Sequence, residues 1–426
     1  MYITKRISLS ILFSVALCLT AKSQARQATR SPFSAFGIGE YYGNSLAHNQ
    51  GMAGVGYSNP QYYYLNSKNP ALLVFNTLTV FESGVVGEKR TLKDGESVEK
   101  NASGNLNYLA LGFPVKRGRW ATSTGLMPYT NVNYKLNYTD NIVGSTNKVA
   151  VSETGTGGIN QVFLSNGVAL NKYFSVGATV NYLFGSINNR YSNVLLDTQQ
   201  ALVFVPTVEE GYYFKDYNFS AGFSFHKDSI SKKNYRINFG LVYDFRANIN
   251  TAYYARTERS VANKFLDSLT LTNYSGTTTL PQSFGAGISF SKADNLTFGA
   301  DVQYLDYAQF RDFKGQNFNG AGAWKIALGG EFTPNATSPG SYLKRITYRT
   351  GVNIDQYPYL VNGNTLKDFG INFGLSLPVS RISSLDLGVK IGKRGDLGLN
   401  KIEENYFKLY FGVTFNDQWF IKRRFD

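Results

Sequence analysis

Residues suited to catalysis are scarce in this chain of 426 residues. His48 and His226 are its only histidines and Cys18 is its only cysteine. No motif of a zinc protease, a serine hydrolase or a P-loop surrounds them. We expect both histidines to be packed or solvated. The sequence therefore predicts no catalytic site, no metal site and no cofactor, which indicates a protein that is not an enzyme.

Charged residues recur instead within segments that alternate apolar and polar positions. In Lys367–Pro378 the odd positions from Phe369 are apolar and the even positions from Asp368 are small or polar. Neighbouring side chains of a strand point to opposite faces, so one face is apolar and the other wet. We expect the wet-face cations to form an internal ion-pair network with interleaved carboxylates, or alternatively to bind a ligand. The candidates are Arg236, Arg345, Arg349, Lys390 and Lys408.

The last alternating segment, Tyr406–Phe415, has this period of two without exception. Its second face carries glycine, small polar groups and Lys408, a mixture typical of a wet or plugged lumen. Its position close to the C-terminus suits the closing strand of an outer-membrane barrel. Such a strand must pair with the first one, because lipid cannot satisfy an open edge.

The composition agrees with a barrel. Aromatic residues make up 15% of the chain, which excludes disorder. After the N-terminus no apolar run is long enough for a spanning helix. The net charge of +14 is scattered rather than gathered in one patch, so we expect contact with membrane lipid and not with nucleic acid.

Fourteen segments have strand patterns, an even number as in most bacterial barrels. They are Thr77–Gly87, Gly104–Val115, Arg119–Leu136, Gly158–Asn171, Tyr173–Ile187, Gly211–His226, Lys233–Asn248, Pro281–Phe290, Asn295–Asp306, Gly322–Phe332, Leu343–Gln356, Lys367–Pro378, Ile382–Lys393 and Tyr406–Phe415. Short and long connections alternate, and short turns face the periplasm. We therefore predict an all-β, transmembrane, antiparallel barrel in the outer membrane of a Gram-negative bacterium, with both termini periplasmic.

The ends of the chain differ from the middle. Residues 1–23 are basic and then apolar, as in a secretory signal peptide. A lipoprotein anchor at Cys18 is the alternative, but Leu17 stands where a small residue is needed. Residues 24–75 are rich in glycine and tyrosine without alternation, so we expect a plug in the lumen. The barrel would occupy 76–416 and a periplasmic tail 417–426.

Two predicted long connections carry apolar residues. Leu202 and Phe204 lie in the third long connection of the chain. Phe265 and Leu269 lie in the fourth long connection, at helical spacing. We expect these loops to pack on themselves over the barrel mouth. The functional alternative is an apolar groove where an amphiphile first lands.

Several short motifs, in this order, resemble the FadL-type outer-membrane transporters of long-chain fatty acids and other hydrophobic compounds. They include 31–39, 51–56, Asn69-Pro70-Ala71, 125–129, 157–161 and 416–424. The resemblance implies a fourteen-stranded barrel with an N-terminal hatch, in which Asn69, Pro70 and Ala71 are the hatch motif. It also implies that Met127 and Pro128 lie where the third strand opens the wall sideways; Pro128 cannot donate to the ladder. The sequence departs from the family at Lys68 and in lacking glycine after Ala71.

The resemblance implies a channel for hydrophobic or amphipathic small molecules such as long-chain fatty acids, with capture at the extracellular loops and lateral exit through the wall. Barrels of this family also serve as accessory subunits. The alternative is therefore a non-transporting accessory or scaffold barrel of an outer-membrane protein assembly or secretion complex, with outer-membrane or periplasmic proteins as partners.

Overall fold

The computed structural model describes residues 30–419 except 44, 143–147, 197–203, 229, 231–233, 262–263, 293–294, 318–321 and 381. The predicted signal peptide and residues 420–426 of the predicted tail lie outside this part. No helix among the described residues is both long and apolar enough to cross a bilayer.

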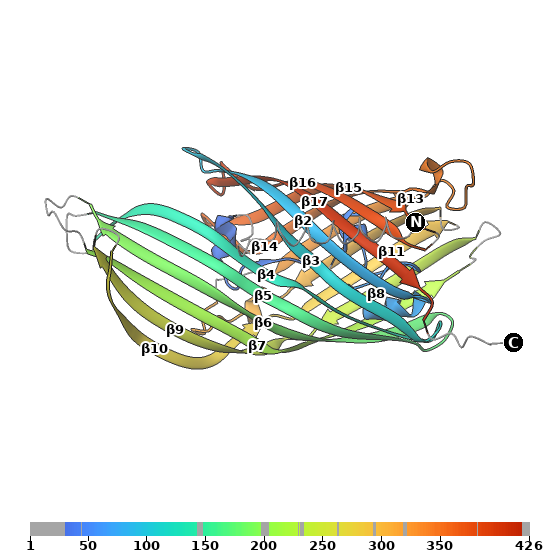
Figure 1. The fold of residues 1–426 in the computed structure, drawn as a ribbon, viewed down its shortest axis with the longest axis horizontal. Coiled ribbons are helices and arrows are strands. Elements are labelled where there is room, and N and C mark those ends of the chain that lie inside the picture. The colour runs from blue at the N-terminus through green and yellow to red at the C-terminus, as the bar shows by residue number, and fades with distance from the viewer. Residues whose placement is uncertain are drawn as a thin grey trace, which may run out of the picture.

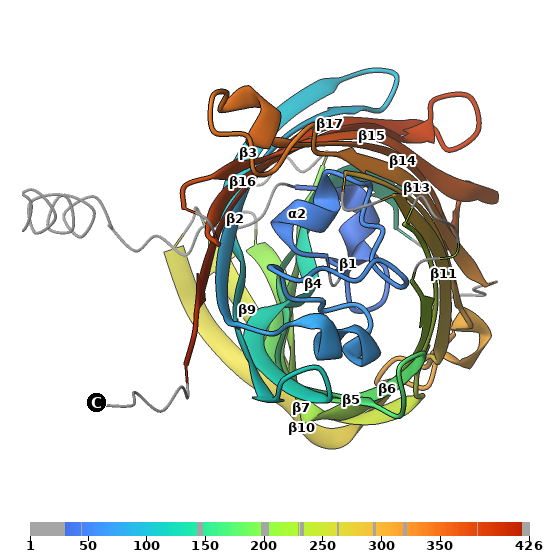
Figure 2. The same cartoon turned by 90° about the vertical axis from the view of Figure 1, so that its right-hand side faces the viewer.

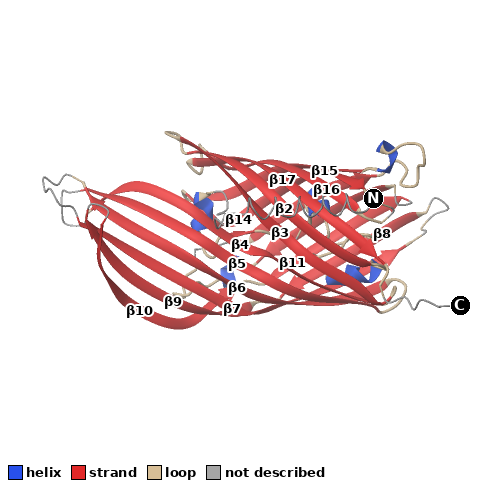
Figure 3. Cartoon of the chain, viewed as in Figure 1, coloured by secondary structure: helices blue, strands red, loops and turns tan. Residues whose placement is uncertain are grey.

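Strands make up most of the described chain, and the helices are short (Figure 3). In chain order the elements are η1 (Pro32–Ala35), β1 (Glu40–Tyr41), α2 (Ala47–Gln50), η2 (Pro70–Phe75), β2 (Thr79–Lys93), β3 (Val98–Lys116), β4 (Trp120–Asn141), β5 (Lys148–Ala169), β6 (Phe174–Leu195), β7 (Phe204–Lys227), β8 (Tyr235–Asp244), β9 (Ala247–Val261), β10 (Lys264–Leu280), β11 (Ser283–Lys292), β12 (Leu296–Leu305), η3 (Tyr307–Gln309), β13 (Ala323–Phe332), η4 (Leu343–Arg345), β14 (Thr347–Val361), β15 (Asn364–Pro378), β16 (Ser384–Asp396) and β17 (Ile402–Asp417).

The strands β2–β17 form one closed antiparallel barrel (Figure 1). β7 pairs with both β8 and β9, which follow one path with a break at Phe245. β10 and β11 likewise follow one path, with a break at Pro281. Two pairs of strands therefore share a path, and the sixteen strands make fourteen paths. β17 closes the ring on β2, with Phe411 opposite Val85. The predicted fold class and strand number are confirmed.

Alternation along each strand produces the two faces of the wall. In β15, Asp368 and Asn372 are buried, whereas Phe369 and Phe373 are 46% and 52% exposed. A row of exposed aromatic and aliphatic side chains is stable only against lipid. The outer face of β15 is therefore the membrane face.

Charged residues mark where the outer wall leaves the hydrocarbon. Arg190 lies on the same face of β6 as the exposed Tyr182 and pairs with Glu258 at 3.2 Å. Arg256 pairs with Glu209 at 2.9 Å beside it. Such groups do not face lipid tails. We call the part of the wall beyond the apolar band the six-strand extension: 129–141 of β4, 148–158 of β5, 186–195 of β6, 204–215 of β7, and all of β9 and β10.

This extension corrects the prediction of long loops at 188–210 and 249–280. Phe204 begins β7, and Phe265 and Leu269 belong to β10, so they lie on strands and not on a helix. Irregularities between Phe265 and Asp267 and between Thr270 and Thr272 shift the alternation of β10. These shifts interrupt the period of two that a regular strand would show in the sequence. Leu202 lies outside the described residues.

The assignment of Arg345 to the lumen is wrong. β14 begins only at Thr347, and Arg345 is exposed in the short helix η4 that precedes it. Its guanidinium lies 5.1 Å from the ring centre of Tyr342. The helical turn interrupts the alternation on which the assignment rested.

Residues 30–43 and 45–78, which we call the N-terminal segment, lie inside the ring of strands (Figure 2). Arg30 contacts Asn101 near the turn that joins β2 to β3. Asp417, in contrast, pairs with Thr79 at the start of β2, at the other end of the barrel. The first and last described residues are therefore at opposite ends of the barrel.

Replacing Phe373 with arginine should impair insertion much more than the same change at Phe415, near the end of β17. A cation at the midplane costs about 2–4 kcal/mol and one near the interface about 0–1 kcal/mol. The fraction of heat-modifiable, folded barrel in outer membranes measures the difference. Equal insertion of the two variants would contradict this placement of the membrane.

Candidate functional site

The wall is split between β3 and β4. Their ladder runs from Lys116 opposite Trp120 to Leu109 opposite Leu126 and ends there, although both strands continue. β4 pairs with β5 along its whole length, with an irregularity between Pro128 and Thr130. We call the separated parts, 98–108 of β3 and 127–141 of β4, the seam. The predicted Met127 and Pro128 lie at its closed end, with the Met127 side chain buried.

The N-terminal segment bridges the seam from inside. β1 pairs with β4 through Glu40 opposite Asn131 and Tyr41 opposite Thr130. The Ser31 amide donates to the Asn133 carbonyl at 2.8 Å. On the other side, the Arg30 amide donates to Asn101 Oδ1 of β3 at 3.1 Å. The segment thus supplies backbone partners to β4 and a side-chain contact to β3, where the two strands do not pair with each other.

Glu40 fixes β1 to strands on the other side of the seam. Its carboxylate accepts from Arg90 of β2 at 2.9 Å and pairs with Arg394 of β16. Arg90 also contacts Glu404 at 3.4 Å, and Arg394 contacts Asp368 at 2.9 Å. All five side chains are at most 10% exposed. Buried charges persist only with good partners, so this network holds the segment in one position.

The predicted hatch motif anchors the segment at the other end of the barrel. Asn69 caps η2, where its Oδ1 accepts from the Ala71 amide at 3.0 Å. Its Nδ2 donates to the carbonyl of Tyr57 at 2.8 Å and to that of Phe223 on β7 at 3.1 Å. The Ala71 carbonyl accepts from Ser175 of β6 at 2.8 Å. These residues therefore tie the segment to the wall.

Glycines on the inner wall make room for the segment. A Cβ atom at Gly177 would lie 2.5 Å from the backbone of Pro70, and one at Gly351 would lie 2.7 Å from that of Met52. Side chains cannot approach so closely. Further wall glycines in close contact with the segment are Gly112, Gly167, Gly222, Gly240, Gly285, Gly287, Gly299, Gly329, Gly374 and Gly412. We call this set the glycine belt.

Three further polar contacts, all with Asp301, join the segment to the wall. Asp301 of β12 accepts from the amides of Gly56 and Tyr57 at 2.8 and 3.0 Å, and it pairs with Lys68 at 3.5 Å. Lys68, a departure from the family motif, is therefore a structural tether.

The predicted lumenal cation Arg349 lies near the same segment. Arg349 donates to Glu331 at 3.0 Å, and Glu331 also accepts from Gln61 of the segment. The Arg349 guanidinium lies 5.6 Å from the ring centre of Tyr64.

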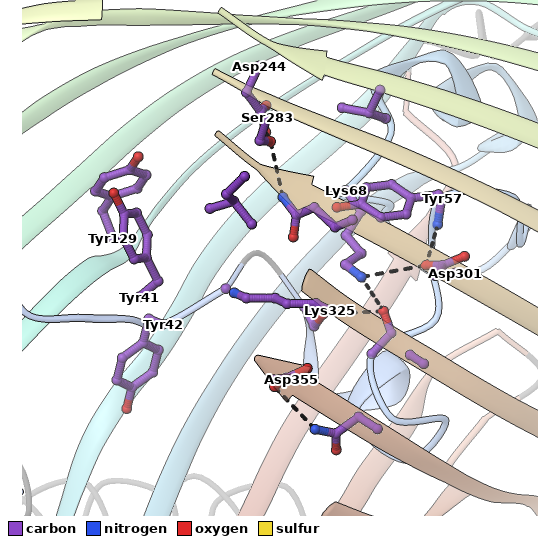
Figure 4. Close-up of a pocket in the computed structure, with 18 of the residues that line it drawn as sticks. Tyr41, Tyr42, Tyr57, Lys68, Tyr129, Asp244, Ser283, Asp301, Lys325 and Asp355 are labelled. Carbon is purple, nitrogen blue, oxygen red and sulfur yellow. Dashed lines mark hydrogen bonds and ion pairs between the residues drawn. The ribbon is translucent and has the colours of Figure 1, made fainter. Parts of the chain in front are cut away.

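Beside the segment lies a cavity of about 230 Å³ (Figure 4). Lys325 extends from β13 into it toward Tyr41 and Tyr42, while Lys68 and Asp301 pair at its edge. The charged residues that line it are Lys68, Asp244, Asp301, Lys325, Asp355, Asp368, Lys390, Arg394 and Lys408. Interior space with so many acidic and basic side chains suits water or a small hydrated ion.

The structure brings three of the predicted cations into the lumen. Arg349 is buried, and Lys390 and Lys408 line the cavity. Lys408 pairs with Glu88 at 3.2 Å. Arg236 lies at the start of β8, where it pairs with Asp228 and its guanidinium lies 5.5 Å from the ring centre of Tyr62 in the N-terminal segment. Phe265 and Leu269 lie on the six-strand extension, away from all of these.

Sequence reasoning missed the charges of the segment itself. Glu40 and Lys68 are the only Asp, Glu, Lys or Arg residues between Ser31 and Leu78. Each one meets opposite charge on the wall. That isolation in an uncharged stretch was the signal that could have identified them.

Both histidines lie among aromatic rings. His48 is buried and stacks on Tyr64 with 4.4 Å between ring centres, and burial holds the pKa of His48 well below its usual range. His226 meets Phe75 edge to face at 4.8 Å. The geometry favours packing roles for both.

Known barrels share this fold. The toluene transporter TodX of Pseudomonas putida superimposes with a TM-score of 0.61 at 13% identity, covering 89% of this chain and 100% of that one. The toluene transporter TbuX of Ralstonia pickettii gives 0.57 at 14%, covering 88% and 98%. A FadL homologue of Pseudomonas aeruginosa gives 0.56 at 13%, covering 89% and 98%. The chain therefore has a divergent FadL-type fold.

No curated protein matches the sequence. A family model described as BamG, however, matches residues 4–426, almost the entire chain. This outer-membrane β-barrel belongs to the BamG family.

Proposed function

We propose that this barrel is a non-enzymatic accessory or scaffold subunit of an outer-membrane protein assembly or secretion complex. The observation that carries the proposal is the content of the lumen. Its cavity of about 230 Å³ is smaller than most small-molecule sites, which measure about 300–1,000 Å³, and charged residues line it. An acyl chain there would desolvate several lysines and carboxylates without pairing them.

The attachment of the N-terminal segment supports a permanently filled lumen. The glycine belt contacts it on many strands, and Glu40, Lys68 and Asn69 are each bonded to the wall. Passage of a substrate would have to break several buried contacts together. A structural role requires no such step.

The six-strand extension supports interaction with other proteins. Its strands extend farther than the other strands at that end of the barrel (Figure 1), and its ion pairs on the outer face place it outside the apolar band. We infer that this end is extracellular, because long hairpins of such barrels face outside. Membership of the BamG family also favours an accessory role over transport.

We also propose the boundaries taken from the sequence: export removes residues 1–23, residues 24–75 plug the lumen, 76–416 span the membrane and 417–426 form a periplasmic tail. The contacts of Asn69, Pro70 and Ala71 with the wall support the plug. We place the C-terminus in the periplasm, opposite the six-strand extension.

A second candidate function is a channel for hydrophobic or amphipathic small molecules such as long-chain fatty acids. The seam beside Met127 and Pro128 favours it, because an unpaired wall is a route for lateral exit. In this scheme Phe265 and Leu269 capture the molecule, and Lys390 or Lys408 meets its carboxylate. The FadL-type fold supports this scheme as well.

Extraction of the native protein from outer membranes, followed by native mass spectrometry, separates the two functions. We expect a protein partner in fixed ratio and no long-chain fatty acid. Uptake of labelled fatty acid by cells with this barrel as their only FadL-type protein should equal that of cells without it. The accessory role would be overturned if the barrel is extracted without a protein partner and if cells that contain it show saturable uptake of the fatty acid.

Replacing Glu40 with glutamine should weaken the attachment of the N-terminal segment to the barrel wall. Loss of one partner of a buried ion pair costs about 3–5 kcal/mol, so the amides of residues 38–42 should exchange hydrogen at least about a hundredfold faster. Glu99→Gln is the control, because the Arg30–Glu99 pair is exposed and worth about 0–1 kcal/mol. Unchanged exchange in Glu40→Gln would show that the ion pairs do not hold the segment.

The second candidate makes its own prediction at Pro128. Pro128→Val supplies a backbone donor, so it should narrow the exit and reduce fatty acid uptake while the barrel stays folded. Uptake of labelled fatty acid is measured in the cells described above. Val132→Ile, a change on the same strand, is the control. Normal uptake by Pro128→Val would exclude an exit at this position.

A further inference from the structure

One edge of the six-strand extension has no strand beside it. The ladder partners of β10 are all on β9, from Lys264 opposite Val261 to Leu280 opposite Ala247. On the other side, the described residues give β10 a single isolated bridge, Thr279 with Arg311, at its inner end. The next path, β12, pairs with β11 and not with β10. The backbone of 264–278 therefore presents a free edge, seen at the lower left of Figure 1.

The two other edges near this level are protected. β1 covers β4 at Thr130 and Asn131, and farther out the β4 edge carries Lys135 and Asp140. The edge of β3 in the seam carries Glu99 and Lys100. Charges on an edge strand prevent pairing with other chains.

The edge of β10 has charged residues only at its outer end, at Lys264 and Asp267, and the rest of it lacks this protection. From Ser268 to Leu280 it has no charged residue, and it is rich in threonine, which favours extended backbone. Phe265, Leu269 and Tyr274 are 61%, 65% and 55% exposed. An exposed, apolar and unprotected edge strand is a site for strand pairing.

Lipid does not satisfy this edge. The outer face of the adjoining strand β9 carries Asn248, Asn250 and the paired Arg256 and Glu258, so the hairpin stands outside the apolar band. In hydrocarbon an open edge would also leave its backbone groups unpaired. Water can hydrate the edge outside the membrane, and an extended polypeptide is the neighbour that would replace this water with a ladder of backbone hydrogen bonds.

We propose that the free edge of β10 binds an extended strand of a different protein by β-augmentation at the cell surface. A matching strand is uncharged over about five to seven residues and places apolar side chains beside Leu269 and Tyr274. Backbone hydrogen bonds supply affinity, and the alternate apolar side chains supply specificity.

A second copy of this chain fits the edge poorly. Two copies in one membrane share the direction of the membrane normal, so their β10 strands would run parallel. A twofold axis along the membrane normal would relate the two copies. The two joined sheets would then curve in opposite directions, which the uniform twist of a continuous sheet disfavours. The inference goes beyond the proposed function, because it depends only on the β9–β10 hairpin and a transporting barrel could carry the same site.

Site-specific photocrosslinking in intact cells tests it. A photoreactive phenylalanine analogue at Asn273 should crosslink to one protein, and the crosslinked peptide should be an uncharged extended segment. Leu269→Lys should lower the yield about tenfold, since a charge on an edge strand opposes pairing. Tyr138→Lys on the β4 edge, where Tyr138 is 48% exposed, is the matched control and should leave the yield unchanged.

Hydrogen exchange provides the second measurement. Amides of 268–278 should be protected in the isolated complex and exposed in the barrel alone, whereas those of 135–141 should be the same in both. Both variants must first show the heat-dependent mobility shift of a folded barrel. Crosslinks to lipid or to a second copy, equal loss in both lysine variants, or unprotected β10 amides in the complex would each overturn the proposal.

Discussion

The close contact between the N-terminal segment and the glycine belt is the constraint on which the rest of the structure depends. A fourteen-stranded wall encloses more space than its own inward side chains fill, and here a second layer of backbone occupies that space. The approach of Met52 to Gly351 and of Pro70 to Gly177 is possible only where the wall has no Cβ. The lumen is consequently a packed core with a small charged cavity and not an open pore.

The barrel itself was predictable because lipid imposes a strict pattern. Within the apolar band each strand must alternate, as β15 does from Phe369 to Phe373, so that strand number and direction follow from the sequence. Beyond the band both faces of a strand meet water or other polar groups, and the alternation fades. In β9 and β10, Asn250 and Thr277 occupy positions where lipid would have required apolar residues. For this reason the extension resembled loops in the sequence.

The contacts of the site were not predictable to the same extent, because they join residues far apart in the chain. Nothing near Glu40 indicates that Arg90 and Arg394 converge on it, and the seam is visible only once β3 and β4 are paired. Short-range signals had mixed success. The Asn69-Pro70-Ala71 motif does contact the wall. The prediction for Arg345 was wrong because this residue lies in the helical turn η4 and not in a strand.

The position of the N-terminal segment also constrains the order of assembly. The last pairing of the ring joins 403–417 of β17 with 79–93 of β2, so the two ends of the barrel sequence meet at closure. Pairings between such distant residues form slowly, because loop-closure entropy must be overcome first. Residues 30–78 precede β2 and fill the lumen in tight contact with many strands. The ion pairs of Glu40 join this segment to β2 and β16, on both sides of β17, so we infer that the barrel closes around a segment that is already inside.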